Sequence, residues 1–249
     1  QQLHITKLPP LPMPLDNLSA TYADGCLYVA GGKGKPQTVP IGQDGSQTAP
    51  TNPLFSLQLT PSLQKEWVRL PDFPGPARVQ PVLTAQQSED GIRLYLAGGF
   101  QPASAHQEAI VCTDMLSYHP KTKQWRNEGF LPSLAGGSHR TVTGGCAIAS
   151  GDSSILLVGG VNYDRFRDAL NHPEPDYLLH PADWYKFNTS LLQYNTFTKH
   201  WTHLGNYEEL ARAGAGIANN ANTVIIIGGE LKPGIRTPEV NAFKLTCHP

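Results

Sequence analysis

Four times along this 249-residue chain, an apolar run ends in a pair of glycines. The second glycines of these pairs are Gly32, Gly99, Gly160 and Gly229, so the intervals are 67, 61 and 69 residues. Before each run lies another strand-like segment, such as GGCAIAS, and after each pair comes a loop and then a segment with β-type alternation, such as DMLSYHP. Self-similarity at a fixed period indicates a repeat architecture.

Three of the repeats continue to a tryptophan, Trp67, Trp125 or Trp201, at an equivalent position that predicts a packing role. The order of two strands, a Gly pair, a loop, a third strand and a strand with tryptophan resembles the kelch repeat, whose unit is a four-stranded blade of a β-propeller. A side chain at the Gly pair would hold neighbouring backbones apart or block the positive φ of the turn. We therefore predict an all-β fold, a kelch-type β-propeller with four recognisable blades.

The repeats divide one predicted domain, residues 1–249, into units of roughly 15–74, 75–132, 133–208 and 209–249. The early segment LHITKLPPLPMP aligns with EWVRLPDFPGP and so resembles an outermost strand, whereas the C-terminal VNAFKLTCHP stops after a third strand. We expect residues 1–14 to complete the last blade and close the ring, which would remove open sheet edges. Four blades can close a ring but more are usual, so part of a larger ring stays an alternative.

Composition supports the same class. The chain contains 24 glycines and 22 prolines, spread along it in turn-like dipeptides, which favours many short strands. A net charge of -1 gives no electrostatic footprint for nucleic acid or an anionic membrane. Apolar runs such as ILLVGG are far shorter than the roughly 20 residues that span a bilayer. We expect no nucleic-acid partner and no membrane insertion, and the sequence leaves the oligomeric state open.

The ends and the cysteines give weaker indications. The sequence begins QQLHITKLPP, without a methionine or an apolar signal region, which fits either a mature form after signal-peptide removal or a start within a gene. We favour the first and expect a periplasmic or secreted protein. Cys26, Cys112, Cys146 and Cys247 form no CxxC pair, so we expect no zinc site. Cys26 and Cys146 lie in or beside strand-like runs and are expected to be buried, although a disulfide stays open.

The loops after the Gly pairs are the predicted binding region, because loops on one face of a propeller converge on its axis. The polar and aromatic residues of these loops are Lys33, Lys35, Phe100, Gln101, Asn162, Tyr163, Arg165, Glu230, Lys232 and Arg236. Only the fourth loop combines a carboxylate with cations, and Pro233 stiffens it.

This fourth loop, GGELKPGIRT, resembles the signature of the bacterial sialic acid mutarotases, also called N-acetylneuraminate epimerases, which carry Gly-Glu-x-Lys-Pro-Gly-x-Arg-Thr in a kelch blade. The segments FPGPAR, HPKTKQW, VGGVN and ADWYKFNTSLLQYN agree in order, so the similarity spans nearly the whole chain. The family is six-bladed, whereas four units are found here, and two more would follow Pro249.

The resemblance implies interconversion of the α and β anomers of N-acetylneuraminate, or of a similar 2-keto acid sugar, without cofactor or metal. The family's catalytic carboxylate falls on Glu230 and its essential arginine on Arg236. A hemiketal opens when a base takes the anomeric hydroxyl proton and an acid protonates the ring oxygen, which suits Glu230. A guanidinium can fork onto the substrate carboxylate, which suits Arg236. An ordinary surface ion pair is the alternative.

Six further residues are candidates for binding the sugar: Lys232, Arg78, His139, Asn162, Tyr163 and Arg165. Each also has a structural alternative. Lys232 could be a solvated loop charge, and Arg78 or His139 could satisfy buried backbone carbonyls. Asparagine and tyrosine after a Gly pair are also common in turns for conformational reasons.

Functions of other classes compete with the mutarotase hypothesis. A kelch propeller can be a non-catalytic module that binds glycan or protein through its loops. A copper oxidase of the galactose oxidase type shares the kelch blade but needs a Tyr/His metal constellation, which these loops do not supply. A sialidase would need repeated Ser-x-Asp-x-Gly-x-Thr-Trp turns, and the sequence contains none.

Overall fold

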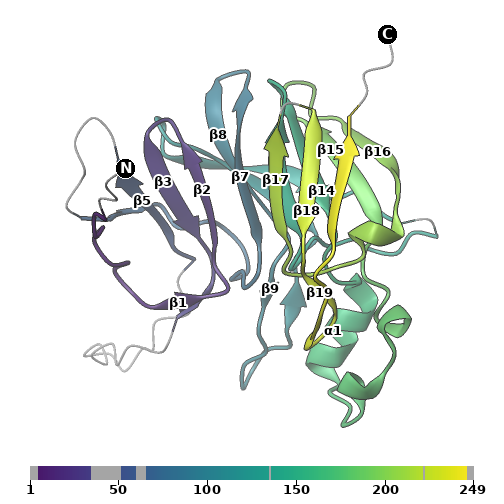
Figure 1. Ribbon diagram of the computed structural model, residues 1–249. Coiled ribbons are helices and arrows are strands. Elements are labelled where there is room, and N and C mark those ends of the chain that lie inside the picture. The colour runs from purple at the N-terminus through teal and green to yellow at the C-terminus, as the bar shows by residue number, and fades with distance from the viewer. Residues whose placement is uncertain (1–4, 35–51, 60–65, 135, 221, 246–249) are drawn as a thin grey trace.

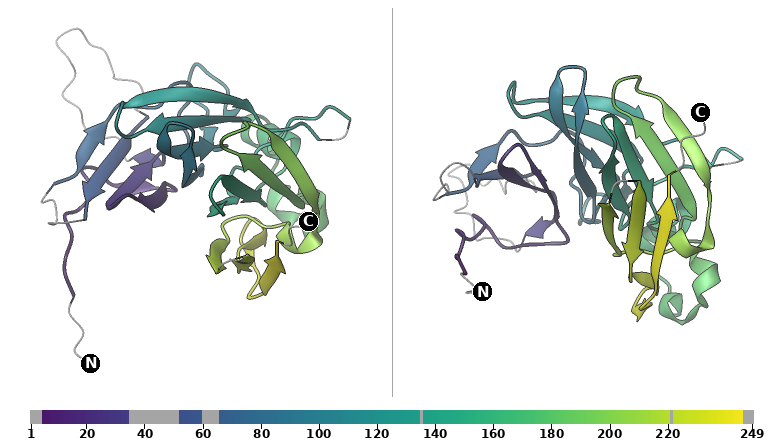
Figure 2. Two further views of the ribbon diagram at one scale, coloured as in Figure 1. Left: turned by 90° about the horizontal axis from the view of Figure 1, so that it is seen from above. Right: turned by 45° about the horizontal axis from the view of Figure 1, so that its top comes forward.

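The computed structural model describes residues 5–34, 52–59, 66–134, 136–220 and 222–245. In this part of the chain, four antiparallel sheets follow one another in sequence order. They are arranged as an arc, with the first and fourth sheets at its two ends (Figure 2). This arrangement confirms the prediction of an all-β, kelch-type propeller with four blades. No helix among the described residues has the length and apolar character to cross a membrane.

Each of the first three blades is a four-stranded sheet (Figure 1). The strands of the first blade, from the inside outward, are β2 (Ser19–Ala23), β3 (Cys26–Ala30), β5 (Leu54–Gln58) and β6 (Val68–Leu70). Those of the second blade are β7 (Val82–Ser88), β8 (Gly91–Ala97), β11 (Asp114–His119) and β12 (Gln124–Phe130). Those of the third blade are β13 (Cys146–Ser150), β14 (Ser154–Val158), β15 (Ser190–Asn195) and β16 (Trp201–Asn206).

The fourth blade has three described strands, β17 (Gly216–Asn220), β18 (Thr223–Ile227) and β21 (Val240–Lys244). Three two-stranded sheets pair β1 (Leu15–Asp16) with β4 (Lys33–Gly34), β9 (Phe100–Gln101) with β10 (Ile110–Val111), and β19 (Glu230–Lys232) with β20 (Ile235–Arg236). The helices are α1 (Tyr163–Asn171) and the 3-10 turns η1 (Tyr177–Leu179), η2 (Ala182–Tyr185) and η3 (Glu208–Leu210).

The N-terminal segment differs from its expected role as a closing strand. Residues 5–14 form no strand, and the fourth sheet lies at the other end of the arc. The indole of Trp67 instead donates a hydrogen bond of 3.0 Å to the carbonyl of Pro9, just as Trp125 donates one of 2.9 Å to Pro71. Pro71 follows the outer strand of the first blade. The segment therefore lies where the outer strand of a preceding blade would lie, as the repeat alignment indicated, but it does not pair with the fourth blade.

The Gly pairs let adjacent blades approach closely. Gly159 has a φ of +67°, and a Cβ there would lie 2.5 Å from the carbonyl oxygen of Arg212 in the next blade. Between the second and third blades, a Cβ on Gly98 would lie 2.9 Å from the backbone nitrogen of Thr143. Both the conformation and the space therefore require glycine. This is the packing reason that the sequence analysis gave for the repeat.

Two of the three repeat tryptophans, Trp125 and Trp201, pack as predicted. The ring of Trp125 lies 6.0 Å from that of Phe73 in the first blade and 5.1 Å from that of Tyr118. Trp201 lies 4.8 Å from Tyr194. Edge and tilted contacts at these separations are favourable for aromatic pairs. The indoles of Trp125 and Trp201 therefore join the hydrophobic clusters between blades, and a packing role is confirmed for these two residues.

The cysteines within the described part of the chain are free. Cys112 and Cys146 are buried, and burial raises the pKa of each thiol to about 11. Cys26 is half-buried, with its Sγ 2.9 Å from Oε1 of Gln58. These side chains act as small packing groups, as expected of Cys26 and Cys146. Cys247 and Lys35 lie outside the described residues.

Candidate functional site

The hairpin β19–β20 carries the charged motif. Gly228 and Gly229 adopt positive φ at the end of β18, and Gly234, also at positive φ, forms the tight turn with Pro233. Antiparallel pairing places Glu230 opposite Arg236, with a register shift beyond Glu230. The glycines and the proline therefore fold the motif back on itself, so that residues six positions apart become neighbours.

The backbone of Glu230 is fixed at the inner edge of the fourth blade. Its N–H donates to the carbonyl of Ala213 at 2.7 Å, and its carbonyl accepts from the N–H of Ala213 at 3.0 Å. In the second blade, Phe100 and Val79 make the same reciprocal pair, at 2.9 and 2.8 Å. The residue after the Gly pair is thus held at an equivalent place in both blades, beside the segment that leads into the inner strand. Glu230 occupies that place in the fourth blade.

The side chains of Glu230 and Arg236 form an ion pair. The Nη2 atom of Arg236 lies 2.9 Å from Oε1 of Glu230. The Arg236 side chain is 74% exposed and that of Glu230 is 28% exposed. An exposed pair of this kind contributes at most about 1 kcal/mol to folding. The structure therefore brings together the two predicted catalytic residues, with the carboxylate partly shielded and the guanidinium open to solvent.

Lys232 fastens the hairpin to the long insertion of the third blade. Its Nζ donates to the carbonyl oxygens of His180 at 2.6 Å and Leu178 at 3.1 Å. The ammonium also lies 6.0 Å from the centre of the Tyr185 ring. Figure 1 shows β19 beside the insertion that contains α1. The ammonium that was a candidate for binding sugar is therefore engaged with protein carbonyls, and it positions the hairpin.

Three candidate residues start the insertion. Asn162 is the N-cap of α1, and its Oδ1 accepts a hydrogen bond of 3.0 Å from the N–H of Arg165, as N-cap asparagines commonly do. The guanidinium of Arg165 lies 4.4 Å from the centre of the Trp184 ring. The ring of Tyr163 lies 5.1 Å from that of His139. Asn162 and Arg165 thus have structural partners, while Tyr163 and His139 are brought together.

Arg78 lies away from any surface that a sugar could reach. Its side chain is fully buried, and its Nη2 lies 2.8 Å from both carboxylate oxygens of Asp114. Its Nη1 donates to the carbonyl of Gly98 at 3.0 Å. Arg78 therefore has the structural role that was the alternative to sugar binding: it donates hydrogen bonds to a buried carbonyl and to a carboxylate.

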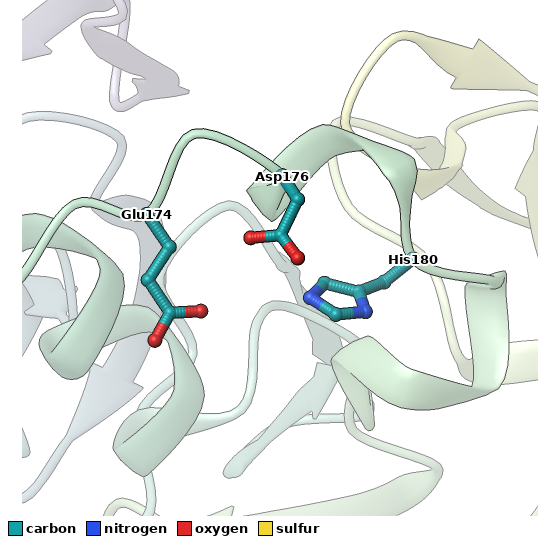
Figure 3. A group of neighbouring side chains, drawn as sticks. All are labelled: Glu174, Asp176 and His180. Carbon is teal, nitrogen blue, oxygen red and sulfur yellow. The ribbon is translucent and has the colours of Figure 1, made fainter.

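Within the described residues, one group has the spacing of metal ligands. Ligand atoms of Glu174, Asp176 and His180 lie within 4.8 Å of one another (Figure 3). The ring of His180 is stacked at 3.8 Å on that of Trp184. Both carboxylates are exposed, and exposed acidic groups of this kind occur widely without an ion. We therefore assign no metal to the group.

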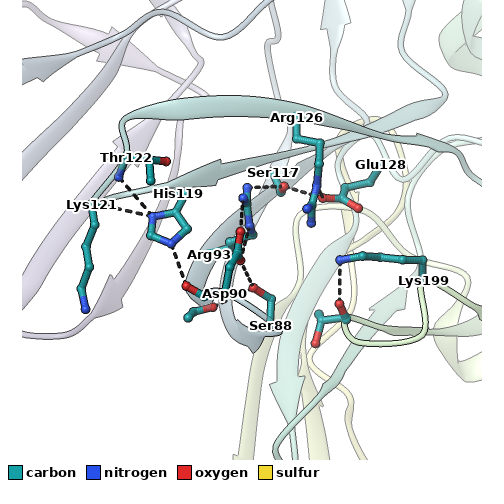
Figure 4. A network of polar contacts seen from close by, with 12 residues as sticks. Ser88, Asp90, Arg93, Ser117, His119, Lys121, Thr122, Arg126, Glu128 and Lys199 are labelled. Atoms are coloured by element: carbon teal, nitrogen blue, oxygen red, sulfur yellow. Dashed lines mark hydrogen bonds and ion pairs between the residues drawn. The ribbon is translucent and has the colours of Figure 1, made fainter.

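A polar network that was not predicted from the sequence lies in the second blade (Figure 4). The Glu128 carboxylate is 3% exposed, and it accepts hydrogen bonds from Ser117 Oγ, from Arg126 Nε at 2.7 Å and from the Tyr194 hydroxyl at 2.9 Å. Burial acts to raise the pKa of Glu128, but these bonds together hold it below its usual value of 4.5. Since Tyr194 belongs to β15, the network joins the second and third blades and is structural.

A large groove, of about 1380 Å³, lies away from the hairpin. It runs between the third blade and β21, and its lining includes Leu191, Leu204, Asn241 and Phe243. The outward edge of β21 has no strand partner among the described residues, unlike the third strand of each other blade. The groove therefore marks the open side of the fourth sheet, and we assign the candidate site to the hairpin.

Comparison with known proteins agrees with the motif. A family model described as N-acetylneuraminate epimerase matches residues 8–248. N-acetylneuraminate epimerases of Salmonella paratyphi B and Pasteurella multocida are each 27% identical to the chain, over 248 and 215 residues, and that of Haemophilus influenzae is 30% identical over 243 residues. These alignments cover 94%, 81% and 91% of this chain, but 57%, 52% and 60% of the relatives. The chain thus spans little more than half the length of these relatives.

The solved structure of YjhT has the same fold. It superposes with a TM-score of 0.72 over 96% of this chain and 67% of YjhT, at 24% sequence identity. The propeller arrangement, the Glu230–Arg236 hairpin and the family match over residues 8–248 lead to one conclusion. This chain belongs to the N-acetylneuraminate epimerase family.

Proposed function

We propose that this chain interconverts the α and β anomers of N-acetylneuraminate, or of a similar 2-keto acid sugar, with Glu230 as the acid/base group and Arg236 as the anchor of the substrate carboxylate. Family membership and the names of the relatives support the reaction class. The single observation that carries the assignment of residues is the 2.9 Å contact between Glu230 and Arg236 at the inner edge of a blade.

The proposed reaction needs one carboxylate that can take and return a proton. Glu230 accepts the proton of the anomeric hydroxyl, the bond between the anomeric carbon and the ring oxygen breaks, and the open-chain ketone forms. The proton then passes to the ring oxygen, so that no net proton is gained or lost. Reclosure on the other face of the carbonyl, by the reverse steps, gives the other anomer. Partial shielding of Glu230 suits this role because a group engaged in proton transfer works best with limited competition from water.

Arg236 suits the role of anchor because its guanidinium is open to solvent. It has five N–H donors, and its Nη2 lies 2.9 Å from Oε1 of Glu230. Because the side chain is 74% exposed, its donors can form parallel hydrogen bonds with a carboxylate on the anomeric carbon. The reacting atoms would then lie beside Glu230. An arginine beside the acid/base group thus sets the position of the substrate.

A non-catalytic module that binds sialic acid is the second candidate. The observation that favours it is the 74% exposure of the Arg236 side chain, which can bind a carboxylate without any opening of the sugar ring. Binding without any change in the anomeric ratio would indicate this function.

The test is proton NMR of freshly released α-N-acetylneuraminate with and without the chain. The mutarotase function predicts that conversion to the β anomer is faster than the spontaneous rate, in proportion to protein concentration. Conversion at the spontaneous rate, with a chain shown to be folded by circular dichroism, would contradict it. Saturation-transfer signals from the sugar in that case would identify the binding module.

A further inference from the structure

Two blades contain a buried arginine at the same repeat position, four residues before the inner strand. In the second blade Arg78 bonds to both oxygens of Asp114 at 2.8 Å. In the fourth blade Arg212 Nη2 lies 3.2 Å from Oε2 of Glu239. Asp114 directly precedes Met115, which pairs with Ala97 at the end of β8. Glu239 directly precedes Val240, which pairs with Ile227 at the end of β18. The two ion pairs are therefore equivalent in the strand register. Each buried cation thus has its own carboxylate.

The third blade lacks this ion pair. In this blade the residue four positions before the inner strand is Val142, where the other two blades have arginine. The residue before the one that pairs with the end of β14 is Ser190, where they have an acid. An arginine occurs instead two residues earlier, at Arg140. No acidic side chain within the described part of the chain lies within 4.0 Å of its nitrogens, and Nε and Nη1 have no hydrogen-bond partner there.

Arg140 is nevertheless only 7% exposed. The other described arginines that are buried to this degree, Arg78, Arg93 and Arg212, each pair with an aspartate or glutamate. Burial lowers the pKa of the Arg140 guanidinium, as expected of a cation without a compensating charge. A buried charge costs several kcal/mol unless a partner satisfies it, so the site is incomplete without an anion.

The neighbours of Arg140 place it on the face of the Gly pairs. His139 contacts the Tyr163 ring of α1 at 5.1 Å, and Thr141 Oγ1 donates to the carbonyl of Cys112 at 2.7 Å. Arg140 therefore lies at the junction of the second blade, the third blade and α1. The hydroxyl of Thr141 donates to Cys112 and accepts from the N–H of Thr143 at 3.2 Å, and neither bond involves Arg140.

The same segment leads to the hairpin of the fourth blade. The carbonyl of Gly144 accepts a hydrogen bond of 2.7 Å from Gly214, and the adjacent Ala213 pairs with Glu230. Gly144 follows Arg140 by four positions, which limits their Cα atoms to about 14 Å apart. The flexible arginine side chain can span part of that distance. The uncompensated cation and the proposed acid/base group thus lie on one connected edge of the arc.

We propose that Arg140 binds the carboxylate of the sugar acid, as a second guanidinium in addition to Arg236. This inference rests on the proposed function. A carboxylate has about four acceptor positions, so it can bind two guanidinium groups at once. Arginine suits the site because its planar fork matches a carboxylate and because it is more weakly hydrated than lysine, which reduces the cost of burial.

The test compares Arg140→Gln with two matched variants. Arg78→Gln removes an arginine of similar burial that has an acidic partner, and Arg69→Gln removes an exposed arginine of the first blade. Thermal unfolding without ligand should show Arg78→Gln several degrees less stable than the parent chain, because Asp114 loses its partner. Arg140→Gln should be as stable as the parent or more stable, since it removes a charge that has no partner.

Titration calorimetry with N-acetylneuraminate and with its uncharged methyl ester supplies the binding readout. The parent should bind the acid at least about tenfold more tightly than the ester, a ratio typical of one charged hydrogen bond. Arg140→Gln should reduce this preference at least about threefold, Arg140→Lys should keep part of it, and Arg69→Gln should leave it unchanged.

Undiminished preference for the acid in a folded Arg140→Gln would overturn the inference, and so would a loss of thermal stability as large as that of Arg78→Gln. The outcome is separable from that of the proposed function. A parent chain that shows the Arg140-dependent preference but no mutarotation would retain the anion site and refute the enzyme. Mutarotation with an unchanged KM in Arg140→Gln would support the enzyme and refute the anion site.

Discussion

Arg236 Nη2 lies 2.9 Å from Glu230 Oε1 across the turn that Pro233 and Gly234 form. The two side chains differ in environment, since the guanidinium is largely exposed and the carboxylate is partly shielded. This contact contributes little to folding because solvent screens it. Its effect should therefore be found in substrate binding and catalysis.

Replacing Arg236 by lysine retains the charge but removes the forked donor. We expect kcat/KM to fall about 10- to 100-fold, chiefly through KM, because one charged hydrogen bond contributes about 1.5–3 kcal/mol. The free energy of unfolding should change by less than about 0.5 kcal/mol, as is usual for an exposed position. Steady-state mutarotation kinetics and urea unfolding measure the two effects. Arg167→Lys is the control, because Arg167 is an exposed arginine 3.8 Å from Asp164; equal kinetics in both variants would contradict the anchor role.

Replacing Lys232 by methionine removes the two hydrogen bonds to the carbonyls of Leu178 and His180. The hairpin should then lose its attachment to the insertion, and amide hydrogen exchange should accelerate in β19 and η1. We expect kcat to fall several-fold, because misplacement of a catalytic group lowers the rate. Lys199→Met is the control, since Lys199 donates to the carbonyl of Thr196 away from the hairpin. If exchange in β19 is equal in the two variants, Lys232 does not position the hairpin.

Replacing Gly159 by alanine tests the close approach of blades. The new Cβ would lie 2.5 Å from the carbonyl oxygen of Arg212, at a φ of +67°. We expect a loss of at least about 2 kcal/mol in the free energy of unfolding, from strain and displacement together. Gly151→Ala is the control, because Gly151 also has positive φ but its Cβ would meet nothing within 4 Å. That variant should lose about 1 kcal/mol. Equal losses in guanidinium unfolding would show that packing at the Gly pair has no role.

The Glu128 network should make stability depend on pH. Because the pKa of Glu128 is lower in the folded chain than its usual value of 4.5, its ionised form stabilises the fold above that value. This contribution is lost as the pH falls from 4.5 through the folded-state pKa. Glu128→Gln should cost about 1–3 kcal/mol at pH 7 and should flatten the decline in stability below pH 4.5. Urea unfolding across this range measures both effects. Glu209→Gln, at an exposed position, should follow the parent curve. If Glu128→Gln also follows it, the network around Glu128 does not contribute to stability.

The repeat made most of the fold predictable from the sequence. Four apolar runs with a Gly pair specify four blades because close packing and positive φ exclude other residues at the pair. The Glu230–Arg236 contact was predictable for a local reason, since Pro233 and Gly234 fold a short segment back on itself. In contrast, residues 5–14, the described part of the segment expected to close the ring, form no strand with the fourth blade, because that pairing depends on whether the two ends of the arc meet.

The contacts of the candidate site were less predictable because they join distant segments. Lys232 reaches carbonyls more than 50 residues earlier, in an insertion that has no periodic pattern. The pairing of Arg78 with Asp114 was not predictable from the sequence, although Arg212 and Glu239 form the same pair in the fourth blade. Arg78 lies 21 residues before Gly99 but Arg212 lies 17 before Gly229, so an alignment by the Gly pairs does not bring the two arginines together. Their equivalence follows from the strand registers of the structure.

The most direct measurement is the rate at which α-N-acetylneuraminate converts to the β anomer, followed by proton NMR with the parent chain, Glu230→Gln and the exposed control Glu208→Gln at equal concentrations. We predict catalysis by the parent and the control, and a loss of about 100-fold or more in the catalysed rate for Glu230→Gln, the range for removal of an acid/base group. Equal catalysed rates for Glu230→Gln and the parent would contradict it.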